Sequence, residues 1–318
     1  ILPCLIIRLI SPWVLIRIEQ LPASTFGDFI LFPALYYCKK KLKIDQPKKR
    51  CIDFVYIPHH LKFCNKQLEK MWKKKLNFLS PYLLGPLYKA NRLIPGFKKH
   101  NIDILSKLSE RDVDNLFQKC QPVLSFTNDE EFYGKNILNS FGLNEGDKFV
   151  CFAVRDKAYD EMRVASRYQD WSYQEYRNNN IDNYMLAAEE LAKRGYFVFR
   201  TGVIAEKPFF SNNPKIIDYA NSSLRSDFMD IYLGAKCSFS VTTAFGVLAL
   251  FQIFNKPCAQ ISVPLAAVHT HCEKNYVLTR HHILKKEKKR LSLSEIFSCG
   301  AAFANDAAAV AANTGAGL

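Results

Sequence analysis

The second half of the chain alternates short strand-like runs with helical segments, and this pattern constrains the fold more than any other feature. Runs rich in β-branched and aromatic residues cover 149–154, 196–200, 216–219, 237–241 and 257–263. Apolar residues at helical spacing lie between them, over 182–194, 227–236 and 244–254. Strands that alternate with helices of this length form parallel sheets, so we predict an α/β fold with parallel sheets flanked by helices.

The first half of the chain shows a weaker form of the same alternation. We expect strands at 14–18, 51–57 and 101–105, helices at 29–38, 61–79 and 130–141, and an irregular segment at 81–99 broken by prolines and glycines. The polar link at 143–148 indicates a boundary, so we predict domains at 1–145 and 146–300. Residues 301–318 form an atypical Ala-rich tail. The first residue is Ile1 rather than Met, which suggests that a preceding piece is missing.

The net charge of +14 is concentrated in one segment. Of the 44 Lys and Arg residues, 17 lie from Lys39 to Lys99, together with three of the 30 acids, so the remaining 27 bases and 27 acids balance. Three interpretations stay open for this segment: an RNA-binding surface, a surface that binds an anionic membrane, and an ordinary solvated helix face. No RNA-binding signature accompanies it, and we expect no nucleic-acid partner. The uncharged stretches of residues 1–18 are shorter than the ~20 residues that span a bilayer.

The ten cysteines form no C-x-x-C pair, and a chain of 318 residues needs no disulfides to fold. We therefore predict reduced thiols in a cytoplasmic protein. One cluster, His269, His271 and Cys272 with His281 and His282 downstream, has ligand-like spacing for zinc. Loop or core residues are the favoured interpretation, and we expect no metal or other cofactor.

Charged and hydroxyl side chains follow the predicted strands of the second half. The strand ends are Arg155-Asp156, Arg200-Thr201-Gly202, Asp218-Tyr219 and Thr242-Thr243. Ligands bind outside the carboxyl ends of parallel strands, and arginines with hydroxyls suit a diphosphate. The alternative is that Arg155 and Arg200 only pair with Asp156 or Asp218.

One turn and three single residues also have structural interpretations, and the turn and Asp28 have functional ones as well. The turn from Thr242 to Gly246 could present N–H groups to a phosphate or be a plain strand-to-helix turn; it lacks the glycine pattern of classical dinucleotide-binding folds. Asp28 could accept a proton from a hydroxyl or be a helix N-cap. Ser226 caps a predicted helix, and Asp227 is interpreted as an acid of its first turn.

Four segments together resemble the TIGR04372 family of bacterial glycosyltransferases found in surface-polysaccharide gene clusters. They are F-V-C-F-A-V-R-D-K-A-Y at 149–159, Y-Q-E-Y-R-N-N-N-I-D-N-Y at 173–184, G-Y-F-V-F-R-T-G at 195–202 and I-D-Y-A-N-S-S-L-R-S-D-F-M-D-I-Y-L-G-A-K-C-S-F at 217–239. The combination of Y-R-N-x-x-I with S-D-F-x-D-I-x-L is specific. The order R-D, R-x-G, S-D-F is also distantly similar to O-fucosyltransferase-like enzymes.

The resemblance implies two facing Rossmann-like domains of glycosyltransferase-B (GT-B) type, with an acceptor-side domain at 1–145 and a donor nucleotide-sugar domain at 146–300. It implies metal-independent transfer from a nucleotide sugar to a surface-polysaccharide or lipid-linked glycan. Arg155 would stabilise the leaving diphosphate and Asp28 would be the base. The implied donor-binding set is Arg155, Asp156, Arg200, Gly202, Ser226, Asp227, Thr242 and Thr243.

Two other functions remain open from the sequence. A sugar-nucleotide epimerase could use the same fold without an acceptor. A non-catalytic module could keep the fold and bind RNA or a membrane through the segment from Lys39 to Lys99. For a glycosyltransferase, the same segment suits docking on the anionic inner face of the cell membrane, where lipid-linked acceptors would be presented.

Overall fold

The computed structural model describes residues 2–61, 63–102, 104, 112, 114–167, 172–243, 246–268, 275–284 and 287–303. The chain divides into two compact units, Ile1–Ser125 with Gln252–Asn255, and Phe126–Phe251 with Lys256–Leu318. The units meet in sequence at Ser125, about twenty residues before the predicted link. The reason is that the helix after Ser125 packs within the second unit.

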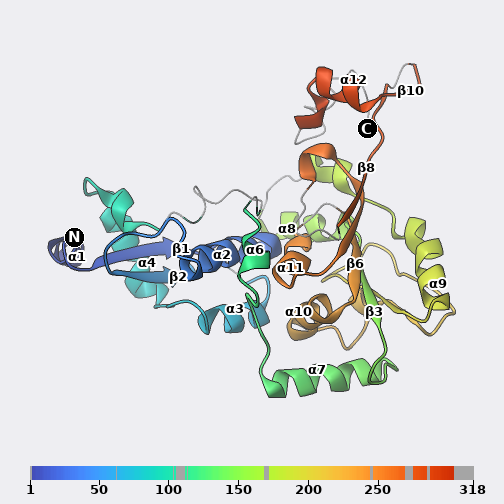
Figure 1. Ribbon diagram of the computed structural model, residues 1–318, viewed down its shortest axis with the longest axis horizontal. Coiled ribbons are helices and arrows are strands. Elements are labelled where there is room, and N and C mark those ends of the chain that lie inside the picture. Colours follow the sequence, from blue (N-terminus) through green and yellow to red (C-terminus); the bar gives the residue numbers. More distant parts are fainter. Residues whose placement is uncertain are drawn as a thin grey trace. The chain divides into compact units, whose positions relative to one another are not determined.

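The first unit is built on two parallel strands, β1 (Leu15–Gln20) and β2 (Cys51–Tyr56), which pair in register from Leu15 with Cys51 to Gln20 with Tyr56. Its described helices, shown in blue to green in Figure 1, are α1 (Leu2–Leu9), α2 (Phe26–Lys41), α3 (Lys66–Lys73), α4 (Pro81–Arg92) and α6 (Leu116–Lys119). A 3-10 helix covers Phe97–His100.

Three predictions for this unit are wrong. The helix expected over 61–79 is only α3, because Asn65 caps it and Phe78 forms a parallel bridge with Val55 of β2. The segment 81–99 contains the helix α4, since proline is compatible with a first helical turn. The strand expected at 101–105 is a single bridge between Ile18 and Asn101 within the described residues.

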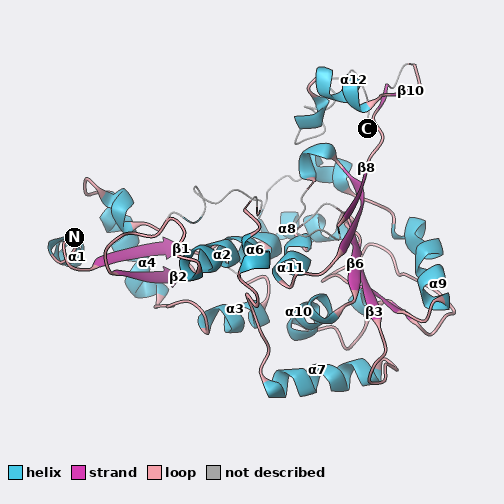
Figure 2. Cartoon of the chain, viewed as in Figure 1, coloured by secondary structure: helices cyan, strands magenta, loops and turns pink. Residues whose placement is uncertain are grey.

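The second unit contains a six-stranded sheet in which every neighbouring pair is parallel. The strand order is β5-β4-β3-β6-β7-β8. The strands are β3 (Phe149–Ala153), β4 (Phe197–Arg200), β5 (Ile216–Ile217), β6 (Phe239–Thr242), β7 (Cys258–Val263) and β8 (Tyr276–Thr279). All are magenta in Figure 2. A short hairpin, β9 (Ile283–Leu284) with β10 (Lys289–Arg290), follows.

The described helices of this unit are α7 (Asn128–Ser140), α8 (Ala158–Arg167), α9 (Met185–Lys193), α10 (Asp227–Lys236), α11 (Leu248–Ile253) and α12 (Leu293–Ser298), with 3-10 turns at Ser172–Arg177, Ile181–Tyr184, Tyr219–Asn221, Leu265–Ala267 and Ala301–Phe303. Residues of α7, α10 and α11 pack on one face of the sheet, and residues of α9 pack on the other. Helix α12 packs in a separate cluster with the hairpin and the turn at Ala301–Phe303. No described helix has the length and apolar character needed to cross a membrane.

The apolar core lies on the two faces of the sheet, as the alternation of side chains along a strand requires. In β3, Phe149, Cys151 and Ala153 pack on the face of α10 and α11. Val150 and Phe152 pack on the opposite face, with residues of α9. The central strands are therefore covered on both faces, whereas the edge strand β8 leaves Tyr276 and Leu278 exposed.

Candidate functional site

The order of the strands defines one switch point in the second unit. The chain runs from β3 through β4 to β5 on one side, and then returns to place β6, β7 and β8 on the other side of β3. In open parallel sheets a ligand-binding crevice forms where the direction of winding reverses, outside the carboxyl ends of the strands. The switch point lies between β3 and β6, where Arg155 and Thr243 follow the two strands.

Arg155 and Thr243 are joined across this switch point. The backbone N–H of Arg155 donates to Oγ1 of Thr243 at 2.9 Å, and the N–H of Thr243 donates to the carbonyl of Ala153 at 3.1 Å. Thr242 donates its hydroxyl to the carbonyl of Thr243 at 3.1 Å, and both threonines are buried. The two hydroxyls thus fix the backbone at the crevice. Ala244 and Phe245, which complete the predicted phosphate turn, lie outside the described residues.

The guanidinium of Arg155 lies at the same edge. Its Nε donates to Oδ1 of Asn178 at 3.0 Å, and it forms an ion pair with Asp160 on α8. This differs from the predicted alternative, in which Arg155 pairs with Asp156 or Asp218. An anion that binds Arg155 must therefore compete with the carboxylate of Asp160.

Arg200 pairs with carboxylates at the sheet edge, which is the alternative to anion binding that the sequence left open. Its side chain is 2% exposed and lies between Asp156 at 3.2 Å and Asp218 at 3.3 Å. Asp156 also accepts from the N–H of Glu206, and Asp218 accepts from the N–H of Phe209. The three charged side chains are at most 17% exposed, and they join the ends of three strands to the loop after β4. The Arg200 charge is already matched by two carboxylates.

Gly202 follows β4 in a turn with space around it. A Cβ atom built on Gly202 would be 3.5 Å from the carbonyl oxygen of Ile204, which is an ordinary contact. The space would admit a side chain, but the φ of +157° is a conformation that favours glycine. The assignment of Gly202 to the donor site stays a prediction.

Ser226 and Asp227 lie at the start of α10. Ser226 caps the helix, because its side chain accepts a backbone N–H of the first turn at 3.2 Å, which confirms that prediction. Asp227 is 3.4 Å from Arg225, and Arg225 lies 2.5 Å from Asp230. Asp230 also accepts from the hydroxyl of Tyr219 at 2.9 Å. Burial raises the pKa of Asp230 above its ordinary value despite these partners.

Arg280 was not predicted, and it lies at the same carboxyl edge, directly after β8. It donates to the carbonyl of Ser262 at 2.9 Å, to that of Asn178 at 2.8 Å, and to that of Tyr176. Among the described residues it forms no ion pair with a carboxylate, and burial lowers its pKa. Asn178 therefore contacts both Arg280 and Arg155. The run Tyr-Val-Leu-Thr before Arg280 is the sequence signal that could have identified a strand ending in arginine.

Asp28 lies in the first turn of α2, after β1. The helix begins at Phe26 and Thr25 occupies the N-cap position, so the prediction that Asp28 is the N-cap is wrong. The hydroxyl of Thr25 donates to the Asp28 carboxylate. Asp28 is half-buried and remains a candidate base.

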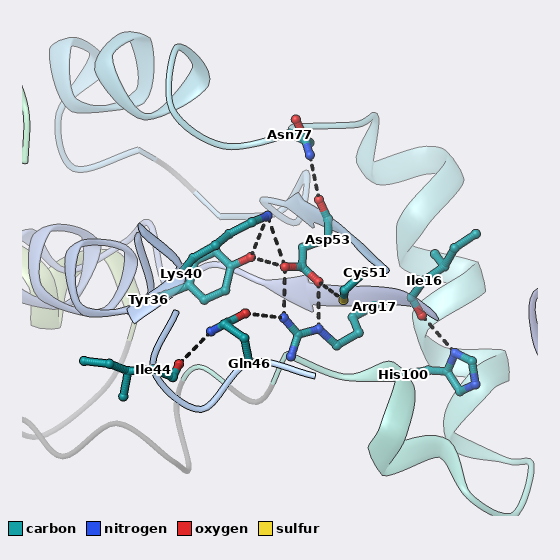
Figure 3. A network of polar contacts seen from close by, with 10 residues as sticks. All are labelled: Ile16, Arg17, Tyr36, Lys40, Ile44, Gln46, Cys51, Asp53, Asn77 and His100. Atoms are coloured by element: carbon teal, nitrogen blue, oxygen red, sulfur yellow. Dashed lines mark hydrogen bonds and ion pairs between the residues drawn. The ribbon is translucent and has the colours of Figure 1, made fainter. Parts of the chain in front are cut away.

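A second polar network, also not predicted, surrounds Asp53 in the first unit (Figure 3). Arg17 makes two hydrogen bonds to its carboxylate, at 2.7 and 2.9 Å, and Lys40 lies 3.2 Å away. The hydroxyl of Tyr36 and the thiol of Cys51 also donate to it. Burial opposes ionisation, but the hydrogen bonds from Arg17 and Tyr36 hold the pKa of Asp53 well below its ordinary value. The network connects β1, β2 and α2.

The possible zinc ligands His269, His271 and Cys272 lie outside the described residues, as does most of the Ala-rich tail. His282 is buried, and burial lowers its pKa. The nine described cysteines are free thiols.

No protein-family model and no curated protein sequence matches the chain. Among solved structures, it is similar to the glycosyl transferase family 9 protein from Veillonella parvula DSM 2008, with a TM-score of 0.50 and 10% identity over 84% of this chain and 87% of that one. It also matches E. coli ADP-heptose lps heptosyltransferase II, with a TM-score of 0.48 and 15% identity over 85% and 91% of the two chains. E. coli heptosyltransferase WaaC with ADP-2-deoxy-2-fluoro heptose matches with a TM-score of 0.38 and 11% identity over 83% and 93%.

At this level of identity, the similarity to the Veillonella protein shows a shared fold. The predicted fold class, α/β of GT-B-like type with parallel sheets flanked by helices, is confirmed.

Proposed function

We propose that the protein is a glycosyltransferase that moves a sugar from a nucleotide-sugar donor to a glycan acceptor. The observation that carries the proposal is the junction of Arg155 and Thr243 across the switch point, in a fold shared with a glycosyl transferase family 9 protein. A cation and an ordered backbone at this position suit the diphosphate of a nucleotide sugar.

In the proposed reaction an acceptor hydroxyl oxygen forms a bond to the anomeric carbon, while the bond between that carbon and the diphosphate oxygen breaks. The electron pair of the broken bond stays on the diphosphate. Arg155 stabilises this charge, and Arg280 adds a second cation at the same edge. The acceptor proton goes to a carboxylate, for which Asp28 is the candidate. Arg200 positions the strand ends and makes no contact with the donor.

The finer parts of the proposal concern the acceptor, metal and location. We propose a surface-polysaccharide or lipid-linked glycan acceptor, in line with the resemblance to the surface-polysaccharide family, and a place at the inner face of the membrane. We also propose that transfer needs no metal, since arginines supply the positive charge at the sheet edge. Turnover should be unchanged in EDTA; a loss that Mg²⁺ or Mn²⁺ restores would contradict this part.

The role of Arg155 is tested by substitution to alanine. We expect turnover to fall by about 10²–10³-fold, the usual effect of removing one group that stabilises developing charge. Arg155→Lys should recover part of it. Arg194→Ala is the matched control, because Arg194 is exposed and its one ion pair within the described part of the chain is with Glu190, one turn away. Turnover that is the same in Arg155→Ala and wild type, with melting temperatures also equal, would exclude this role.

The alternatives are separated by a binding panel and a product assay. A donor-binding enzyme should show a thermal shift with one of the ADP-, UDP-, GDP- or CMP-sugars. An epimerase would convert the donor alone into a different nucleotide sugar, whereas a transferase leaves the donor sugar unchanged until an acceptor is added. A non-catalytic module would show neither a shift nor a product.

A further inference from the structure

Helix α1 exposes an apolar face. Leu2, Leu5, Ile6 and Leu9 lie at the spacing that places residues on one side of a helix, and Trp13 follows one turn later. These five side chains, the α1 face, are between 49 and 73% exposed. Large apolar side chains occur singly on most surfaces, but a contiguous exposed set marks an interaction site.

The α1 face is held in place by the opposite side of the helix. Cys4 is buried, and its thiol lies 3.6 Å from the carbonyl of Leu87 in α4. The guanidinium of Arg8 donates to the carbonyl of Pro95 at 2.6 Å and to Oδ1 of Asn91 at 2.9 Å. The helix is therefore fixed to the first unit on one side, and its apolar face is left to contact something else.

Cations gather at this end of β1 and β2. Lys49 donates to the carbonyl of Ser11 at 2.6 Å, directly after α1, and the carbonyl of Arg50 accepts from Leu15 at 2.9 Å. His100 lies 2.8 Å from the carbonyl of Ile16. Burial lowers the pKa of His100, its hydrogen bond to Ile16 opposes this, and the charges of Arg8, Lys49 and Lys99 lower the pKa further.

These cations are free to attract an anionic partner. Lys48, Lys49, Arg50, Lys98 and Lys99 are exposed, and none of them pairs with a carboxylate among the described residues. Asp45 and Asp53 are the nearest acids in sequence to the first three, and they pair with Lys39 and with Arg17 and Lys40. This end of the first unit therefore combines the apolar α1 face with positive charges that pair with no carboxylate among the described residues.

The basic helix singled out in the sequence cannot supply this surface. The apolar residues of α3, Leu68, Met71 and Trp72, are buried, and the indole of Trp72 donates to the carbonyl of Phe29 at 2.9 Å. Its lysines decorate a helix whose apolar side already lies in the core. Of these two helices, α1 is the one that leaves its apolar side chains exposed.

We propose that the α1 face inserts into the surface of an anionic lipid bilayer, with α1 parallel to the membrane and the surrounding lysines and arginines on the lipid headgroups. Amphipathic helices with basic surroundings bind in this way through buried apolar area and attraction to anionic lipid. The inference deepens the membrane location of the proposed function, but it does not depend on catalysis.

The experiment is vesicle sedimentation with the full chain. Protein is mixed with vesicles of phosphatidylcholine alone, or with 30% phosphatidylserine, at low salt and in 0.5 M NaCl. We expect binding to the anionic vesicles at low salt, and at least tenfold weaker partitioning in high salt, because surface charges are screened within a Debye length of about 3–10 Å in this range. The fluorescence of Trp13 should shift to shorter wavelength on binding.

Two pairs of substitutions separate the apolar and electrostatic contributions. Leu5→Ser with Ile6→Ser should weaken partitioning at least tenfold, and Lys48→Glu with Lys49→Glu should remove its dependence on anionic lipid. Leu186→Ser with Phe210→Ser is the matched control, since both side chains are exposed in the second unit. The melting temperature should be the same in all of these variants.

Three outcomes would overturn the proposal. They are equal binding of the Leu5→Ser, Ile6→Ser variant and the wild type, equal binding to neutral and anionic vesicles, and a dimer in solution that dissociates in that variant, which would place a second copy on the α1 face. Because nucleotide-sugar thermal shifts are measured on the same samples, failure of membrane binding with a retained shift leaves the proposed function intact. If the protein binds the vesicles but shows no shift with any nucleotide sugar, the proposed function fails and the membrane-binding proposal is supported.

Discussion

At the scale of single residues, three arginines at the ends of parallel strands differ in what their guanidinium groups contact. Arg200 is enclosed by Asp156 and Asp218, so its charge serves the sheet. Arg155 shares its charge with Asp160 and reaches the switch point through its backbone. Arg280 contacts only carbonyls and one hydroxyl among the described residues. Partners, rather than residue type, decide which arginine can bind an anion.

Asp53 gives a stability prediction at this scale. Asp53→Asn leaves Arg17 buried beside a neutral amide, and we expect a loss of about 3–5 kcal/mol in the free energy of unfolding, the usual cost of breaking a buried pair. Urea unfolding at pH 7 measures it. Asp45→Asn is the control, because the Asp45 side chain is 72% exposed, and it should cost less than about 1 kcal/mol.

The same pair predicts a pH dependence. The pKa of Asp53 is lower in the folded protein than the ordinary value of 3.8, so its contribution to stability is complete above that value. The contribution is lost as the pH falls below 3.8 toward the folded-state pKa. The stability gap between wild type and Asp53→Asn should therefore narrow from pH 5 to pH 2; a constant gap would show that ionisation of Asp53 contributes nothing.

At the scale of elements, α7 is placed by its contact with α10. A Cβ atom on Gly134 would lie 2.3 Å from Cζ of Tyr232, which is a steric clash, so the two helices approach closely only because Gly134 has no side chain. Tyr232 also donates to the Glu131 carboxylate at 3.3 Å, and Lys236 pairs with Glu131 at 2.6 Å. These contacts assign α7 to the second unit.

Gly134→Ala should therefore destabilise the protein, although alanine favours helices. We expect a loss of about 1–3 kcal/mol from overpacking, against a propensity gain of about 1 kcal/mol. Thermal unfolding of the variant tests this. Asn136→Ala on the exposed side of α7 is the control and should be neutral or slightly stabilising; a similar gain in Gly134→Ala would show that α7 does not pack on Tyr232.

At the scale of the whole molecule, the chain forms two units that each have their own sheet and core. We expect two transitions in calorimetry, because two-state behaviour is a property of single domains. A nucleotide sugar should stabilise only the second unit. At 100 times its dissociation constant it should raise the free energy of unfolding of that unit by about 2.7 kcal/mol, and with it the temperature of that transition. The Asp53→Asn substitution identifies the transition of the first unit, because it should lower the temperature of that transition. A nucleotide sugar that raises this transition instead would place the donor in the first unit.

The sequence alone determined the α/β class, the approximate positions of the strands from β3 to β7 and the helix α10 with its Ser226 cap. These follow from local chemistry: β-branched runs, helical periodicity and a side chain that accepts a nearby N–H. Tertiary structure decided the rest. Phe78 leaves the helical pattern to pair with β2, Arg200 joins acids 44 and 18 residues away in sequence, and Arg155 meets Thr243 only because β3 and β6 are neighbours. A sequence records which groups can pair, whereas the order of strands in the sheet decides which of them meet.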